Sequence, residues 1–262
     1  MRQFSGWQIA ILAVLLVCVC CTFAGVGIVG LAYVAWDQET PTRAQAIVTT
    51  TRVVATTGSV GAPSLTRTPT RIANPYQVII PTPSAPTTLY PIAFDSRLTI
   101  ATYNVAGKTV NEISKSLESN AMPDPSEPGS RYYALTRWHL ASDWSVRPSL
   151  RGCDVTNGTV TVMLTMTLPL LTSAGVPTDT RNRFDTFIEK TVQHESGHVE
   201  ITLQGAREYQ RALGNHPSAP NCDALNTQLN ALFRQHFDSI QRANREYDAK
   251  TKHGRTQGAV FP

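Results

Sequence analysis

The sequence predicts an α+β fold in which a small, mostly antiparallel sheet packs on a long hairpin of two helices. Apolar and polar residues alternate over residues 159–168, the pattern of a strand with one buried face. Helical periodicity covers residues 178–213 and returns over residues 223–248. A Gly-Asn pair and two prolines separate these stretches, so the helices should run antiparallel.

The remaining elements come before the alternating strand. A short strand is predicted over residues 97–105 and stops at Gly107. Thr109 then precedes apolar residues at helical spacing, which predicts a short helix that ends before the proline-rich stretch 122–128. Residues 132–146 are rich in aromatic side chains and predict a second strand. The buried face of the alternating strand should carry Val160, Val162, Leu164, Met166 and Leu168.

The N-terminal part, residues 1–37, predicts a transmembrane signal-anchor. No charged residue occurs between Trp7 and Trp36, and a bilayer core needs only roughly 20 apolar residues. Arg2 precedes the span, whereas acidic residues follow it, so the N-terminus should be cytoplasmic and the rest of this single-pass protein extracytoplasmic. The alternative is a cleaved signal peptide, with a processing site near Ala24.

Residues 38–95 predict a disordered linker. They are rich in Thr, Pro, Ser and Ala, and they show neither helical nor strand periodicity. The segment should therefore act as a stalk between the membrane and a folded domain at residues 96–262.

Charge and cysteine content narrow the class of partner and the compartment. The net charge is +4 on a chain that is only 16% charged, which does not indicate a nucleic-acid partner. Cys18, Cys20 and Cys21 fall within the predicted span. Cys153 and Cys222 lie in what should be an oxidising compartment, so we expect them to form a disulfide.

A metal-binding motif lies within the first long helix. Residues four apart share a helix face, so both imidazoles of an H-E-x-x-H sequence can reach one zinc ion (Zn2+). The glutamate beside them could then take a proton from a metal-bound water. The motif predicts His194 and His198 as ligands and Glu195 as the catalytic base of a zincin-like site; it reads His194-Glu195-Ser196-Gly197-His198.

The motif leaves the third protein ligand open. A catalytic zinc normally has three protein ligands and one open position. Gln204 stands where a metzincin would have its third histidine, so that continuation is excluded. His236 on the second helix, Asp248 at its end and His253 beyond it are the candidates.

The chain resembles a bacterial family described as predicted secreted zinc-dependent proteases, a domain of otherwise unknown function. The resemblance covers about residues 97–262. Its ending is the most specific part after the zinc motif, and it implies that His253 is the third ligand, ahead of Asp248 and His236. The matching features are residues 103–109, Trp138, Trp144, Cys153, Leu168-Pro169, residues 194–198, Cys222 and residues 247–259.

We therefore expect a membrane-anchored, extracytoplasmic zinc metallopeptidase that cleaves peptide or protein substrates and needs no organic cofactor. One alternative is a surface-displayed zinc-binding or adhesion module without activity, in which four ligands close the metal shell. Another is a zinc hydrolase of non-peptide amides in the cell envelope. Tyr247 and His139 are candidates for stabilising the oxyanion.

Overall fold

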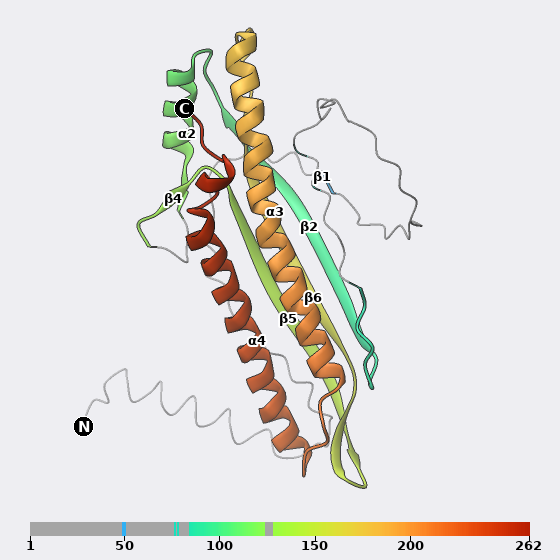
Figure 1. The fold of residues 1–262 in the computed structure, drawn as a ribbon. Helices are drawn as coiled ribbons and strands as arrows, with labels where there is room; N and C mark the ends of the chain where they lie inside the picture. The colour runs from blue at the N-terminus through green and yellow to red at the C-terminus, as the bar shows by residue number, and fades with distance from the viewer. Residues whose placement is uncertain (1–48, 51–75, 77, 79–83, 124–127) are drawn as a thin grey trace, which may run out of the picture.

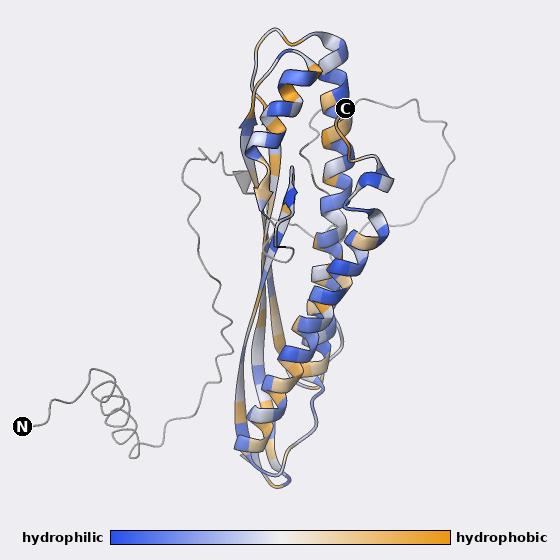
Figure 2. Ribbon diagram, turned by 90° about the vertical axis from the view of Figure 1, so that its left-hand side faces the viewer, coloured by the Kyte–Doolittle hydropathy of each residue, from blue (hydrophilic) through white to orange (hydrophobic). Residues whose placement is uncertain are grey.

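The computed structural model describes residues 49–50, 76, 78, 84–123 and 128–262. The predicted membrane anchor at 1–37 and most of the predicted linker at 38–95 lie outside these residues. Among the helices described, none is long and apolar enough to cross a membrane. The described part has an α+β fold of two layers, a sheet and a helical hairpin (Figures 1 and 2), which confirms the predicted class.

The sheet is mixed, which corrects the expectation of a mostly antiparallel one. Its order is β1-β2-β6-β5, built from β1 (Thr49–Thr50), β2 (Ile92–Val105), β6 (Gly152–Leu171) and β5 (Leu135–Ser149). β6 pairs antiparallel with β5, and its residues from Gly158 to Leu171 pair parallel with the whole length of β2. β2 ends and β5 begins at the same end of the sheet. β6 then follows β5 in the chain and lies between β2 and β5.

The alternation in β6 determines which face carries the core. Its five predicted apolar residues are all buried, whereas the intervening threonines are at least partly exposed. The buried face meets the helices, and in Figure 2 the sheet stands edge-on beside the helical layer. β2 begins at Ile92, before the domain start predicted at residue 96. The preceding segment is also attached, because the Tyr90 amide donates to the Gly214 carbonyl at 3.0 Å.

Smaller elements occupy the end of the domain where β2 stops. Thr109 and Glu112 form a capping box that starts α2 (Val110–Asn120), as expected for a helix that begins after Thr109. A two-stranded ribbon of β3 (Met122–Pro123) and β4 (Arg131–Tyr132) then leads into β5. The Ser114 hydroxyl donates to the Pro262 carbonyl at 2.7 Å, which holds the C-terminal segment against α2.

The helical hairpin consists of α3 (Thr178–Gly214) and α4 (Cys222–Thr251), which run antiparallel across the sheet (Figure 1). Asn221 caps the start of α4, since its side chain accepts from the Ala224 amide at 2.8 Å. The predicted Cys153–Cys222 disulfide is confirmed and joins the start of β6 to the start of α4. Two backbone hydrogen bonds between Cys153 and Ala219 reinforce the same junction.

Replacing both cysteines by serine should lower the free energy of unfolding by about 2–4 kcal/mol, because the bond closes a loop with a sequence separation of 69. Urea unfolding of the oxidised protein, the double variant and a Cys18→Ser control gives the comparison. Equal unfolding midpoints for all three would contradict the expectation.

Candidate metal centre

The middle of α3 places the predicted motif inside the molecule. His194, Glu195 and His198 are 5%, 4% and 8% exposed. Gly197 permits this packing, because a β-carbon there would collide with the Tyr247 ring of α4. The two helices can therefore approach closely where the histidines lie.

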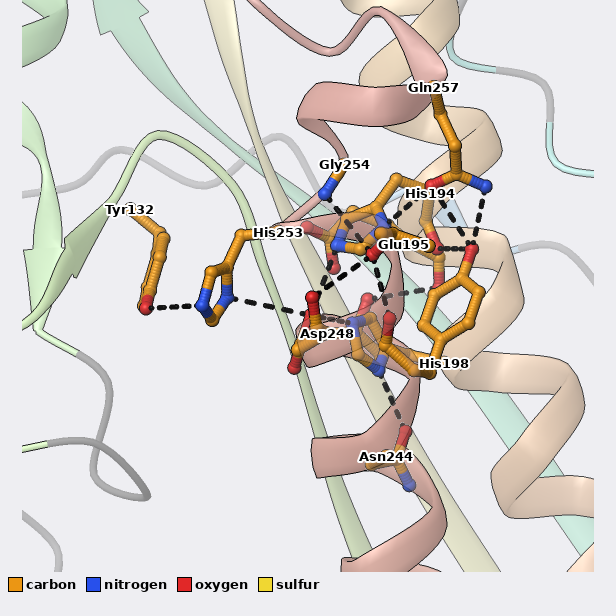
Figure 3. Close-up of polar contacts among 12 residues, drawn as sticks. Tyr132, His194, Glu195, His198, Asn244, Asp248, His253, Gly254 and Gln257 are labelled. Carbon is orange, nitrogen blue, oxygen red and sulfur yellow. Dashed lines mark hydrogen bonds and ion pairs between the residues drawn. The ribbon is translucent and has the colours of Figure 1, made fainter.

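Asp248 of α4 brings a carboxylate to both imidazoles (Figure 3). Its Oδ1 lies 3.0 Å from His198 Nε2 and 3.3 Å from His194 Nε2. One ligand atom from each of the three residues lies within 4.8 Å of the others, close enough to share a metal ion. Two nitrogens and one oxygen are ligands that zinc accepts.

Two amide side chains hold the outer nitrogens of the imidazoles. Asn244 Oδ1 lies 2.8 Å from His198 Nδ1, and Gln257 Oε1 lies 2.9 Å from His194 Nδ1. The amide orientations are consistent, since Asn244 donates to the Ile240 carbonyl at 3.0 Å and Gln257 donates to Tyr247 Oη at 3.1 Å. Because an amide oxygen can only accept, each Nδ1 is the donor.

This tautomer gives the inner side of the cluster the chemistry that a cation would suit. In a neutral imidazole that donates from Nδ1, Nε2 carries a lone pair. The Nε2 lone pairs of His194 and His198 then face the Asp248 carboxylate, and buried acceptors facing one another repel unless a positive charge lies between them. One divalent ion would accept the lone pairs of both Nε2 atoms and of the carboxylate at once. Without a metal, each imidazole would have to bind its own proton to remove the repulsion. The donor set therefore fits a metal.

The pKa shifts have the signs that this arrangement predicts. Burial alone would raise the pKa of Asp248, but when His194 and His198 are protonated, their hydrogen bonds through Nε2 and their positive charge hold it well below its usual range. Burial alone would lower the pKa of His198, yet the hydrogen bond to Asp248 and the charge of Glu195 raise it. Both shifts favour positive charge between an imidazole and the carboxylate.

Glu195 lies beside the cluster, and the pKa of its carboxyl is shifted in the opposite direction from that of Asp248. Its burial raises the pKa of the carboxyl, while the charge of His198 and a hydrogen bond with the Thr136 hydroxyl act in the opposite direction. Thr136 belongs to β5, and its hydroxyl also lies 3.4 Å from the Glu195 carbonyl oxygen. A carboxyl with a raised pKa takes up a proton more readily than an ordinary glutamate, as a group that exchanges protons during a reaction must.

The three candidates for the third ligand lie in different places. Asp248 belongs to the cluster. His253 lies beside it, with Nδ1 3.6 Å from Asp248 Oδ1, Nε2 3.3 Å from Tyr132 Oη, and its ring stacked on Tyr132. His236 is elsewhere, near Tyr209 and Glu208. The prediction of His253 as a ligand is not tested by these contacts.

Two left-handed residues bring the chain back after α4. Lys252 and His253 have φ of 50° and 52°, and Gly254 follows at 77°. The backbone amides of Lys252 and His253 both donate to the Asp248 carbonyl, and these two hydrogen bonds hold His253 close to Asp248. The short 3-10 helix η1 (Arg255–Gln257) then carries Gln257 back to His194.

The two candidates for the oxyanion group also differ. Tyr247 stacks on His194, with ring centres 5.1 Å apart, and its hydroxyl donates to the His194 carbonyl at 3.2 Å. These contacts hold His194 in position. His139 lines the cleft along β5. Tyr132 and His253 form a further pair beside Asp248, and the sequence pattern did not single out Tyr132.

The centre opens into a cleft of about 780 Å³. One wall is formed by residues 131–139 along β4 and the start of β5, which is an edge strand of the described sheet. α3, α4 and the C-terminal segment form the rest, including Phe187, Phe237 and Phe261. Three-ligand metal centres that face such a cleft keep a position for substrate.

The fold and the site together define an α+β domain with a histidine–carboxylate centre between two helices and a sheet edge. The chain belongs to a bacterial family described as bacterial protein of unknown function (DUF922), which matches residues 100–254. The match includes the motif, Asp248 and His253, while Gln257 lies beyond it. No curated protein and no solved structure matches the chain. The family description names no activity.

Gly197→Ala should destabilise the domain by about 1–2 kcal/mol, because the clash with Tyr247 outweighs the better helix propensity of alanine. Thermal unfolding compared with Gln193→Ala, an exposed position on α3, measures the effect. A higher unfolding temperature for Gly197→Ala would contradict the close approach of the two helices.

Proposed function

We propose that this domain is a zinc-dependent peptidase in which His194, His198 and Asp248 hold the metal and Glu195 is the general base. The observation that carries the proposal is the convergence of both motif imidazoles on one carboxylate oxygen, at 3.0 and 3.3 Å, with each outer nitrogen fixed by an amide. Such supporting hydrogen bonds orient metal ligands and strengthen their basicity.

A divalent ion held there supplies the Lewis acidity that polarises a carbonyl and makes water a nucleophile near neutral pH. Glu195 accepts one proton from the attacking water as the new carbon–oxygen bond forms. The same carboxyl returns that proton to the amide nitrogen as the carbon–nitrogen bond breaks. The products are an amine and a carboxylic acid, which becomes a carboxylate when its remaining proton passes to the amine or to solvent. The raised pKa of Glu195 suits it to both roles.

The Tyr132–His253 pair lies where it can assist at the carbonyl. His253 approaches Asp248 Oδ1 at 3.6 Å from the side of β4, and the Tyr132 hydroxyl lies 3.3 Å from its outer nitrogen. A donor from this pair can stabilise negative charge on the substrate oxygen. This role for His253 differs from the ligand role that the sequence resemblance implies.

The cleft also supports a peptide as the substrate. Residues 135–139 of β5 line it, and β6 occupies only one edge of that strand. A free strand edge offers alternating N–H and C=O groups to an extended peptide, which can pair with it as an added strand. Glu195 lies beside the same strand, at Thr136, so a paired backbone would pass the proposed base.

One observation favours the second candidate, a zinc-binding module without activity. If His253 moved from 3.6 Å of Asp248 Oδ1 into the metal shell, four protein ligands would close it. The open cleft argues for catalysis, and the position of His253 decides between the two.

The extracytoplasmic location and the membrane anchor remain proposals. The Cys153–Cys222 disulfide supports export, because such bonds persist in oxidising compartments and are rare in the bacterial cytoplasm. The anchor itself rests on the uncharged stretch between Trp7 and Trp36.

Glu195→Gln should retain one zinc per chain but lower kcat by about 10²–10⁴-fold, because glutamine keeps the shape and cannot accept the proton. Zinc is measured by plasma mass spectrometry after dialysis, and hydrolysis with a mixed library of synthetic peptides. A wild-type protein that binds zinc and cuts no peptide would move the assignment to the non-catalytic module.

Asp248→Ala should weaken zinc binding more than about 100-fold. This loss is larger than the loss usually caused by changing a residue that only hydrogen-bonds to a metal ligand. His253→Ala should keep one zinc within about tenfold of wild-type affinity and lower kcat. Competition with a chromogenic chelator measures each affinity, and His236→Ala, far from the cluster, is the control. Loss of zinc from His253→Ala with retention in Asp248→Ala would reverse the assignment of the third ligand.

A further inference from the structure

The cleft that holds the centre carries an excess of cationic side chains. Among the described lining residues, the only carboxylates are Glu195 and Asp248, both in the centre. The lining arginines and lysine are Arg131, Arg137, Arg245, Lys252 and Arg255. A divalent ion would balance the two carboxylates while the imidazoles stay neutral, so the cationic side chains leave the cleft positive.

Arg245 of α4 and Lys252, the residue that caps the end of this helix, flank the centre. Gln241, Arg245 and Asp248 line the cleft and follow one another at helical spacing, so they share one face of α4. Arg245 comes one turn before Asp248 and Lys252 one turn after it. At 1.5 Å per residue, Arg245 is about 4.5 Å and Lys252 about 6 Å from Asp248 along the helix axis.

The cationic side chains that line the cleft are not neutralised within the described part of the chain. Arg245, Lys252 and Arg255 are exposed and form no ion pair with a carboxylate there. Arg131 donates to the Ala121 carbonyl, which leaves its positive charge without a counter-charge among the described residues. Cations beside a concave, partly apolar wall attract anionic groups more strongly than cations on an open surface.

We infer that the cleft selects peptides with acidic side chains on both sides of the bond that is cut; this inference rests on the proposed function. A strand advances about 3.3 Å per residue, so cations about 4.5 and 6 Å from Asp248 face substrate side chains one or two positions from the scissile bond. The edge of β5 that has no partner strand among the described residues favours a peptide over an anionic polymer without amide groups, since such an edge binds backbone N–H and C=O.

The test uses the full-length protein and three quenched fluorescent peptides with one central sequence. Because successive side chains of a strand alternate between its two faces, the peptides carry Glu, Gln or Lys at both the first and the second position on each side of the cleaved bond. Wild type should favour the Glu peptide over the Lys peptide by about 10–100-fold in kcat/KM at low salt, and less at high salt. Arg245→Gln/Lys252→Gln should reduce the preference to about threefold or less.

The matched control is Arg242→Gln/Lys250→Gln, which removes the same charge from exposed positions of α4 outside the cleft and should keep the preference. Peptides cut at equal rates whatever their charge, or equal loss in the control variant, would overturn the inference and leave the proposed function standing.

A binding arm separates the inference from the proposed activity. Fluorescence anisotropy measures the same peptides on Glu195→Gln, with inorganic polyphosphate as a competitor. Selective binding of the Glu peptide without cleavage by wild type supports the charged cleft and rejects the peptidase. Tight binding of polyphosphate with no binding of the Glu peptide overturns the inference in favour of an anionic polymer.

Discussion

The close approach of α3 and α4 is the constraint on which the rest of the structure depends. Gly197 has no side chain to keep the helices apart, so Tyr247 packs directly on the motif. Asp248, the next residue on α4, then reaches both imidazoles. Without that approach the two histidines would be buried polar groups with no common partner, an arrangement that costs free energy.

The sequence predicts the helices and the main strand well because each has a strong local period. The expected helices at 178–213 and 223–248 correspond to Thr178–Gly214 and Cys222–Thr251. The alternation over 159–168 identifies the buried face of β6 correctly. The parallel pairing of β2 with β6 was not predictable in this way, because the partner of a strand is a long-range choice that local periodicity does not encode.

Keeping His236 as a candidate ligand depended on the rotation of α4 about its axis, whereas the family resemblance of the chain's ending ranked His253 first. The stripe Leu225, Leu229, Leu232, His236 and Ile240 would direct His236 inward. The buried stripe instead runs through Leu225, Leu229, Phe233, Ile240 and Asn244, and leaves His236 half-buried at its side. Asp248 follows Asn244 by four residues, so the two share that face. Asn244 and Gln257 carried no signal of their own, because amides are common on helices and turns.

The covalent junction at Cys222 and the ligand Asp248 lie at opposite ends of α4. The separation is about 39 Å along the helix axis at 1.5 Å per residue. A rotation of one degree about the junction would shift the carboxylate by about 0.7 Å, several times the roughly 0.2 Å tolerance of metal–ligand distances. A small rotation of α4 at its disulfide-bonded end therefore produces a large displacement of Asp248 at the other end. Substitutions beside the turn, far from any reacting group, can in this way alter the distances between the three candidate ligands.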